Sequence, residues 1–103
     1  MNYNVRLAEK KDIHDIRDLV VELAIFEHEP DAVLIDDKYY EKSFEEGLFS
    51  AIIAENETGI IGIAIYYLTF STWKGKMLWL EDLVIKEKYR RLGIGQAIWN
   101  ELI

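Results

Sequence analysis

The sequence predicts a small α/β protein of the α+β type, with the order β-α-α-β-β-β-α around a mixed, largely antiparallel sheet. Branched and aromatic residues gather in short runs of strand length, whereas three other stretches repeat their apolar residues every three or four positions, as helices do. The runs over residues 48–55 and 60–70 are separated only by Asn56-Glu57-Thr58-Gly59, which is typical of a hairpin turn. Hairpins pair their strands antiparallel.

The first half of the chain contains one expected strand and two expected helices. Residues 3–8 form the strand, with Val5 and Leu7 on one face and Arg6 on the other. A helix should follow over residues 10–27, ending before Pro30. Its apolar stripe is Ile13, Ile16, Leu19, Val20, Leu23 and Ala24, and its solvent face is Asp12, His14, Asp15, Asp18 and Glu22.

The second helix should begin at a cap formed by Asp36 or Asp37 and end near Glu46, where Gly47 can stop it. The hairpin over residues 48–55 and 60–70 comes next. Gly62, inside its second strand, indicates a bulge or a close approach of another segment to the backbone.

The last expected strand, residues 77–85, carries two carboxylates in an apolar run, and its composition predicts that it is mostly buried. An unpaired carboxylate there is costly, so Glu81 and Asp82 need a partner, water or a proton. Two of them directly before a glycine turn favour a functional role over a strand end that reaches solvent. Strict alternation places Glu81 with Met77, Trp79, Leu83 and Ile85, and Asp82 with Leu78, Leu80 and Val84.

A local positive charge follows this strand. Four of the twelve basic residues of the chain fall within residues 86–91. Gly93 and Gly95 allow a positive φ and a close approach of a ligand to the backbone. The N–H groups of a helix start attract anions, and Arg90 and Arg91 can add fork-shaped hydrogen bonds. The expected ligand is a phosphate or pyrophosphate.

Two common phosphate-binding motifs do not fit this turn. A P-loop requires Gly-Lys-Ser/Thr, but Gln96-Ala97 follows Gly95. A dinucleotide-binding fingerprint requires a small residue where Ile98 stands and an acidic residue about twenty positions later.

The turn Arg90-Arg91-Leu92-Gly93-Ile94-Gly95 resembles the Gln/Arg-x-x-Gly-x-Gly/Ala signature of the GNAT acetyltransferases. Residues 79–85 before it, and residues 63–70 and 73–76 further upstream, resemble the spermidine/spermine (diamine) N-acetyltransferase branch, and the similarity covers essentially the whole chain. The resemblance implies the N-terminal part of the GNAT acyl-CoA N-acyltransferase fold. It also implies acetyl-coenzyme A (acetyl-CoA) as co-substrate and no metal. The implied contacts are Arg90, Arg91, Leu92, Gly93, Ile94, Gly95 and Gln96 for its pyrophosphate and Leu83, Val84 and Ile85 for its pantetheine arm.

The same resemblance implies transfer of the acetyl group to a primary amine of a small cationic substrate, which is a polyamine, a diamine or a lysine-like amine. Glu81 matches the position of the family's base, which acts through water on the ammonium. Asp82 would orient or attract the cation. Trp73, Glu27 and Glu29 match positions near the acceptor amine.

One departure bears on specificity. The polyamine enzymes usually carry an acidic residue shortly before the tryptophan matched by Trp73, but Phe70-Ser71-Thr72 contains none. A second charge on the substrate would lack that partner. A shorter amine, lysine-like or thialysine-like, therefore remains an alternative substrate.

The length and composition of the chain exclude several other classes of protein. A chain of 103 residues holds one domain at most (1–103), and a net charge of −7 argues against nucleic acid while suiting a cationic amine. We expect no membrane span, no signal peptide and a cytoplasmic location. The absence of cysteine excludes disulfides and thiolate chemistry. The only histidines are His14 and His28, and no ligand spacing around them favours a metal site.

The resembled fold continues past residue 103 with a strand, a helix and a closing hairpin, and that helix normally carries the tyrosine that protonates the leaving thiolate. We therefore expect a fragment or truncated product, or a partner chain that supplies this layer. An uncovered sheet edge predicts a homodimer or a larger homo-oligomer. Two alternatives to the enzyme remain open, namely a non-catalytic acyl-CoA-binding module and an inert self-associating fragment.

Overall fold

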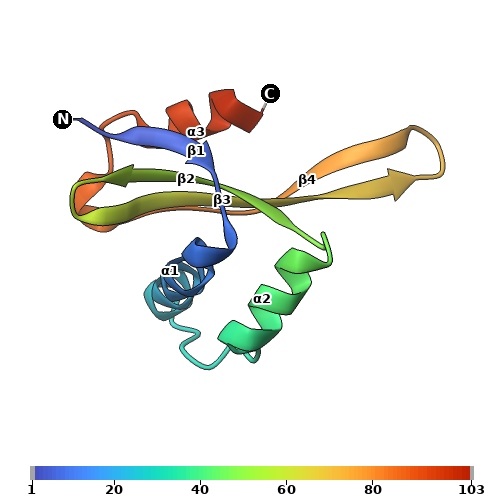
Figure 1. Ribbon diagram of the computed structural model, residues 1–103, viewed down its shortest axis with the longest axis horizontal. Helices are drawn as coiled ribbons and strands as arrows, with labels where there is room; N and C mark the ends of the chain where they lie inside the picture. The colour runs from blue at the N-terminus through green and yellow to red at the C-terminus, as the bar shows by residue number, and fades with distance from the viewer. Residues whose placement is uncertain (1, 103) are drawn as a thin grey trace.

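The computed structural model describes residues 2–102 and has a four-stranded sheet with helices on both faces (Figure 1). The neighbouring strands, in the order β1-β2-β3-β4, all pair antiparallel. The predicted order of strands and helices is confirmed. The elements are β1 (Asn4–Leu7), a 3-10 turn (Lys10–Asp12), α1 (Ile13–Phe26), α2 (Asp37–Glu45), β2 (Ser50–Asn56), β3 (Gly59–Ser71), β4 (Gly75–Ile85), a 3-10 turn (Glu87–Tyr89) and α3 (Ile94–Leu102).

The core has two halves because the sheet is covered on both sides. Helices α1 and α2 lie on one face and α3 lies on the other (Figure 1). On the first face, Ile13, Ile16 and Leu19 of α1 pack with Ala51, Ile53, Ile60, Ile63, Ile65 and Val84. On the second, Ile94 and Ile98 of α3 pack with Ile52, Ala54, Ile61 and Ala64. Burial on both faces explains why β2 and β3 read as continuous apolar runs rather than alternating ones.

Several element boundaries differ slightly from the prediction. The expected helix over residues 10–27 begins with a 3-10 turn, and α1 proper starts at Ile13. The strand β2 starts at Ser50, so Leu48 lies outside it and is 61% exposed. The predicted cap of α2 is confirmed at Asp36, whose side chain accepts a hydrogen bond from the Tyr39 N–H at 2.9 Å. No helix among residues 2–102 is long and apolar enough to cross a membrane.

Asp12 is buried at 5% exposure, and its assignment to the solvent face of the first helix was wrong. The reason is Arg6, which donates to the two carboxylate oxygens of Asp12 at 2.9 and 3.0 Å and to those of Glu55 at 2.8 and 3.1 Å. Burial alone would raise the pKa of Asp12. The hydrogen bonds from Arg6 and from the Glu9 N–H outweigh burial and leave that pKa below its usual value. Arg6 thereby ties β1, β2 and the start of α1 together.

Gly62 combines the bulge and the close contact that its position predicted. The register between β2 and β3 shifts at this point, which leaves Ile61 as an extra residue. A Cβ atom at position 62 would lie 2.7 Å from Cδ1 of Ile85 and 3.4 Å from side-chain carbons of Ile94 and Ile98. The glycine therefore allows β4 and α3 to pack closely on the centre of the sheet.

The strand β4 is less buried than its composition predicted. Val84 is buried, but Met77, Trp79 and Leu83 are 39%, 53% and 40% exposed. The reason lies in the architecture, because the β3–β4 hairpin extends beyond the helices (Figure 1) and β4 is the last strand of the sheet that residues 2–102 form. An apolar composition alone does not reveal whether another element covers a strand.

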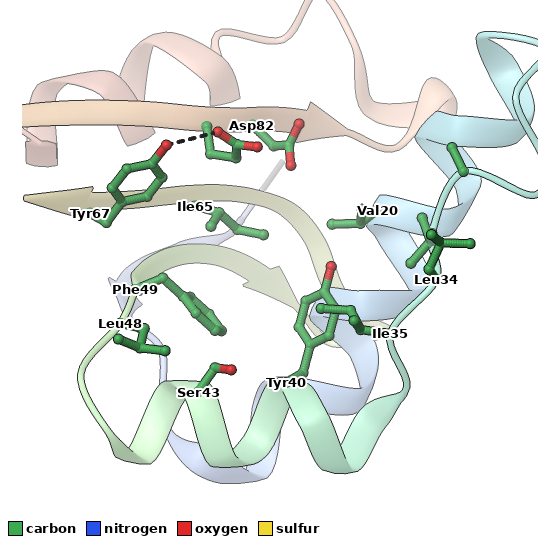
Figure 2. Close-up of a pocket in the computed structure, with 13 residues that line it drawn as sticks. Val20, Leu34, Ile35, Tyr40, Ser43, Leu48, Phe49, Ile65, Tyr67 and Asp82 are labelled. Carbon is green, nitrogen blue, oxygen red and sulfur yellow. Dashed lines mark hydrogen bonds between the residues drawn. The ribbon is translucent and has the colours of Figure 1, made fainter. Parts of the chain in front are cut away.

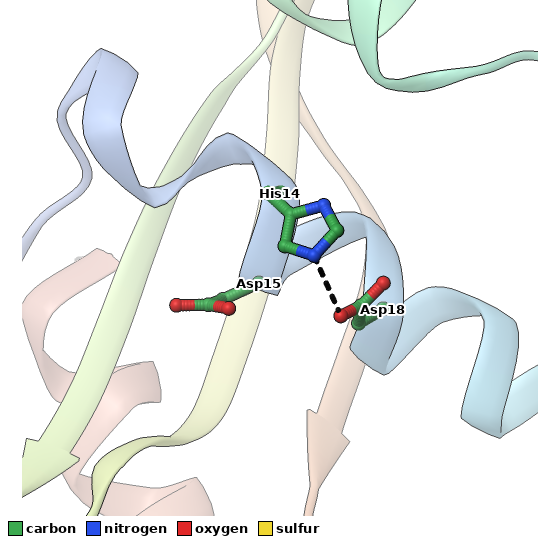
Figure 3. Close-up of side chains that lie close together, drawn as sticks. All are labelled: His14, Asp15 and Asp18. Atoms are coloured by element: carbon green, nitrogen blue, oxygen red, sulfur yellow. Dashed lines mark ion pairs between the residues drawn. The ribbon is translucent and has the colours of Figure 1, made fainter.

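A histidine joins the two helices of the first face. His14 Nδ1 lies 2.6 Å from Oδ2 of Asp37 in α2, and its Nε2 lies 3.3 Å from Oδ2 of Asp18 (Figure 3). These contacts raise the pKa of His14, first through the hydrogen bond to Asp37 and then through the charges of Asp18, Asp37 and Asp15. Potential metal-ligand atoms of His14, Asp15 and Asp18 lie within 4.8 Å of one another, but all three residues are exposed. Because each ring nitrogen faces a carboxylate, ion pairing accounts for the cluster.

The pH dependence of stability tests this helix contact. Because the folded-state pKa of His14 is raised, its stabilisation is fully present below the unfolded-state pKa of about 6.5 and is lost as the pH rises through the folded-state pKa. We therefore expect His14→Ala to lower the free energy of unfolding most at mildly acidic pH, and Asp37→Asn to behave in the same way. Urea unfolding from about pH 5 to 9 measures this. An effect of the same size at every pH would contradict the ion-pair assignment.

Candidate active site

A β-bulge in β4 sets the direction of the two carboxylates. Tyr66 pairs with Leu80 and Ile65 with Asp82, so Glu81 is an extra residue between two regular stretches. An extra residue shifts the alternation of side chains by one position. Glu81 and Asp82 consequently line the same pocket. The prediction that they occupy opposite faces was wrong, because strict alternation does not allow for a bulge.

The pocket lies between β4 and the helices of the first face and has a volume of about 550 Å³ (Figure 2). Its walls are formed by helices α1 and α2, by strands β3 and β4, by the segment between α1 and α2, and by the loop that precedes β2. Glu81 and Asp82 are the only charged residues among those that line it within residues 2–102. The other lining residues are Val20, Ala32, Val33, Leu34, Ile35, Tyr40, Ser43, Leu48, Phe49, Ile65 and Tyr67. The pocket is therefore mainly apolar, with one acidic wall.

The two carboxylates have different surroundings. Glu81 is exposed, and its Oε1 accepts a long hydrogen bond from the Tyr67 hydroxyl at 3.3 Å (dashed line in Figure 2). Asp82 is partly buried, and its pKa is raised first by this desolvation and then by the negative charges of Glu81 and Glu27. Burial, with the charge of Asp82 next, raises the pKa of the Tyr40 hydroxyl on the facing helix. A cation bound here would relieve the repulsion between the two carboxylates.

Sequence reasoning did not identify the two tyrosines of this pocket. Tyr67 reaches Glu81 because β3 and β4 are paired neighbours, and Tyr40 reaches the pocket because α2 packs below the same face. Neither residue stands near Glu81 in the sequence. A register for β3 and β4, including the bulge, would have been needed to find Tyr67.

Three predicted substrate contacts do not line this pocket. Glu27 caps the C-terminal end of α1 and affects Asp82 only through its charge, and Glu29 is exposed beyond that cap. Trp73 lies in the turn between β3 and β4, where it is 93% exposed. The long hairpin carries this turn away from the helices (Figure 1). A role for these residues in amine binding stays a prediction.

The glycine turn before α3 has the backbone that an anion site requires. Gly93 has a φ of +82°, and nothing lies within 4 Å of the position that a Cβ would take there. The Ala97 N–H donates to the Gly93 carbonyl at 3.0 Å and closes the first turn of α3. The N–H groups of residues 94–96 precede that bond, so they have no acceptor within the helix. This open turn and helix start fit a phosphate group.

The two arginines of this turn are placed differently. Arg90 Nε donates to the Ile85 carbonyl at 3.0 Å, and its guanidinium carbon lies 5.2 Å from the centre of the Phe26 ring. Arg90 therefore links the end of β4 to the end of α1. Arg91 is exposed, with a φ of +66°. Phosphate binding by either arginine stays a prediction.

The outer edge of β4 offers backbone groups next to the pocket. Within residues 2–102, β4 pairs only with β3. The Lys86 N–H donates to the Ile61 carbonyl of β3, so by alternation the N–H groups of Leu83 and Ile85 point away from β3. Val84 alternates towards β3, and its side chain is buried. Of the three residues expected along the pantetheine arm, Leu83 and Ile85 thus have the suitable orientation.

The sequence matches known proteins over nearly its whole length. Residues 13–103 match the acetyltransferase (GNAT) family. The chain is 36% identical over 104 residues to the thialysine N-epsilon-acetyltransferase of Bos taurus, which covers 91% of this chain and 61% of that protein. It is 34% identical over 109 residues to the spermidine/spermine N(1)-acetyltransferase-like protein 1 of Homo sapiens, covering 97% of this chain and 16% of that protein. The chain thus spans less than two thirds of the length of either relative.

Solved structures share the fold. An aminoglycoside acetyltransferase from an uncultured soil metagenomic sample, in complex with sisomicin, superposes with a TM-score of 0.80 at 16% identity and covers 97% of this chain and 66% of its own. The glucosamine-6-phosphate N-acetyltransferase of Arabidopsis thaliana has a TM-score of 0.72 at 20% identity, with 99% and 72% covered. These likenesses support the fold, and the match over residues 13–103 shows the family. The chain belongs to the acetyltransferase (GNAT) family.

Proposed function

We propose that this chain carries the amine site and the cofactor-binding loop of an acetyl-CoA-dependent N-acetyltransferase, whose acceptor is a primary amine of a small cationic molecule. The observation that carries the proposal is the bulge in β4, which brings Glu81 and Asp82 into one pocket, upstream of the glycine turn whose backbone fits a phosphate. The family match supports acetyl-CoA as the donor. The relatives named for thialysine and for spermidine/spermine support a polyamine, a diamine or a lysine-like amine as acceptor.

The two carboxylates have separate tasks in this proposal. An amine arrives as an ammonium ion and must lose a proton before it can attack a carbonyl carbon. Asp82, partly buried, holds the ammonium by its charge. Glu81 accepts the proton, through water, and can pass it to solvent because it is exposed. The Tyr67 hydroxyl orients the Glu81 carboxylate through its hydrogen bond.

The acetyl donor would bind at the end of β4 and at the turn that follows it. Acetyl-CoA, when bound, would supply the thioester: a C–N bond to the amine would form as the C–S bond breaks, and coenzyme A would leave with its sulfur taking up, through water, the second proton that the nitrogen releases. The turn at Gly93 and the N-terminus of α3 would bind its pyrophosphate, and Arg91 with Lys86 and Lys88 would add positive charge. The outward N–H groups of Leu83 and Ile85 would hold its pantetheine arm. Because β4 leads directly into the turn, these contacts lie along one continuous segment.

We also propose that the chain forms a homodimer or a larger homo-oligomer. Among residues 2–102, the support is the edge of β4 that no other strand covers, together with apolar side chains on the projecting hairpin, where Leu68, Phe70 and Leu78 are 60%, 76% and 44% exposed. A second copy that covers this surface would remove it from water. Sedimentation velocity at micromolar concentration tests the proposal, and a monodisperse monomer would contradict it.

Cofactor binding is tested by two matched glycine substitutions. Gly93→Glu places a carboxylate where a phosphate should bind, so coenzyme A affinity should fall at least about tenfold, or ~1.4 kcal/mol. Gly75→Glu is the control, since the φ of Gly75 is +83° against +82° at Gly93 and neither Cβ position has a neighbour within 4 Å. Calorimetric titration of the 103-residue chain with coenzyme A measures both. Equal affinities for the two variants would disprove the assignment of the phosphate site.

The assignment of the base is tested by turnover. Glu81→Gln should reduce acetyl transfer about 10²–10⁴-fold at neutral pH and leave coenzyme A affinity unchanged. The loss should shrink towards about pH 9, because more of the amine is then already neutral. Asp82→Asn should chiefly raise KM for the amine, and Glu57→Gln, in the exposed β2–β3 turn, is the control.

Three results would change the proposal. Unchanged turnover of Glu81→Gln over about pH 6 to 9 would remove Glu81 from the mechanism. Coenzyme A binding without any turnover by the parent chain would favour the non-catalytic acyl-CoA-binding module. No binding of coenzyme A at all would favour the inert fragment.

A further inference from the structure

Tyr40 of α2 faces the two carboxylates across the candidate pocket. Figure 2 shows its hydroxyl pointing away from α2 and towards the strands, whereas Ser43, one turn later, stays close to the helix. Burial, and then the negative charges of Asp82 and Glu81, raise the pKa of the Tyr40 hydroxyl, so both carboxylates lie close enough to act on it. Three polar groups, two from β4 and one from α2, therefore converge on one space.

The contacts of its ring and of its helix fix the position of Tyr40. The ring packs edge-on against Phe49, with ring centres 6.0 Å apart, and lies against the core of the first face. One turn earlier on α2, Asp37 pairs with His14 and joins this helix to α1. A side chain that is already held in place loses little conformational entropy when it binds a ligand. Tyr40 is therefore preorganised to hold a group that enters the pocket.

The hydroxyl of Tyr40 has hydrogen-bonding capacity to spare. Among residues 2–102 it has no hydrogen-bond partner, whereas the Tyr67 hydroxyl already donates to Glu81. A phenolic oxygen can accept a hydrogen bond as well as donate one. A primary ammonium carries three N–H donors and no acceptor, so two carboxylates leave one of its donors without a partner. The Tyr40 oxygen can supply the missing acceptor.

We propose that Tyr40 binds the acceptor amine, with its hydroxyl oxygen accepting a hydrogen bond from one N–H of the ammonium while Asp82 accepts from a second. The third N–H then faces Glu81, which takes the proton through water and leaves the electron pair on the nitrogen. This inference rests on the proposed acetyltransferase function and adds a substrate-binding residue to its amine site. It holds for polyamine, diamine and lysine-like acceptors, because each presents a primary ammonium.

A substitution that removes only the hydroxyl tests this role. The 103-residue chain is titrated calorimetrically with thialysine and, separately, with spermidine, the amines for which the two relatives are named. Tyr40→Phe should raise the Kd of the amine that the parent binds by about tenfold, because hydrogen bonds to charged groups are among the stronger ones. Tyr39→Phe is the matched control, since Tyr39 precedes Tyr40 on α2, is 60% exposed and does not line the pocket. The control should leave the Kd unchanged.

Further measurements distinguish a hydrogen bond from a packing role. Tyr40→Leu removes the ring together with the hydroxyl, so it should lower the free energy of unfolding more than Tyr40→Phe does, as urea unfolding measures. If packing of the ring were what mattered, Tyr40→Phe would bind the amine as the parent does and only Tyr40→Leu would bind it weakly. Coenzyme A affinity of Tyr40→Phe should equal that of the parent, because its expected site lies at the turn before α3.

The outcomes separate this inference from the function on which it rests. Weaker amine binding by Tyr40→Phe alone, with coenzyme A affinity unchanged, supports the role of Tyr40. Equal amine affinity of Tyr40→Phe and the parent overturns that role and leaves the amine site at Glu81 and Asp82 in place. An equal loss in Tyr39→Phe, or an equal loss of coenzyme A affinity, assigns the effect to the fold and also overturns it. If the parent binds neither amine, both the inference and the proposed amine site are overturned.

Discussion

The candidate site depends on one extra residue in β4. A regular strand sends consecutive side chains to opposite faces, so two adjacent carboxylates cannot enter the same pocket without an irregularity. The bulge at Glu81 provides that irregularity and brings Glu81 beside Asp82. It also lets Leu80 pack on the α3 side while Asp82 and Val84 face the other helices. A single change in register thereby creates an acidic wall without unpacking the strand on either side.

The rest of the fold holds this bulge in position. Gly62, opposite Ile85, lets α3 pack against the centre of the sheet, where a Cβ would collide with Ile85. On the other face, Arg6 and Asp12 join the first strand to the first helix, and His14 joins that helix to α2. Both helices contribute walls to the pocket. These contacts are far apart in the sequence, yet they determine the distance between β4 and the apolar wall that faces it.

The segment from β4 to the start of α3 has negative charge at one end and positive charge at the other. Partial burial, and then the negative charge of Glu81, raise the pKa of Asp82, and the repulsion between the two carboxylates costs stability in the absence of a cation. A few residues later, positive charge and free N–H groups gather where α3 begins. An arrangement that is unfavourable by itself and favourable with a cation at one end and an anion at the other is typical of a binding site.

Local patterns in the sequence determined the order of the elements, the hairpin, a cap at Asp36 or Asp37, the roles of Gly62 and the basic glycine turn. Each of these depends on residues close together in the chain, and backbone preferences act at that range. Tertiary structure alone decided that Asp12 is buried, that β4 is exposed along much of its length, and that Glu81 and Asp82 share a pocket with Tyr40 and Tyr67. Those features depend on the register of one strand against another and on which helix covers which face. They are contacts between residues that are far apart in the sequence, and local patterns of residues do not determine them.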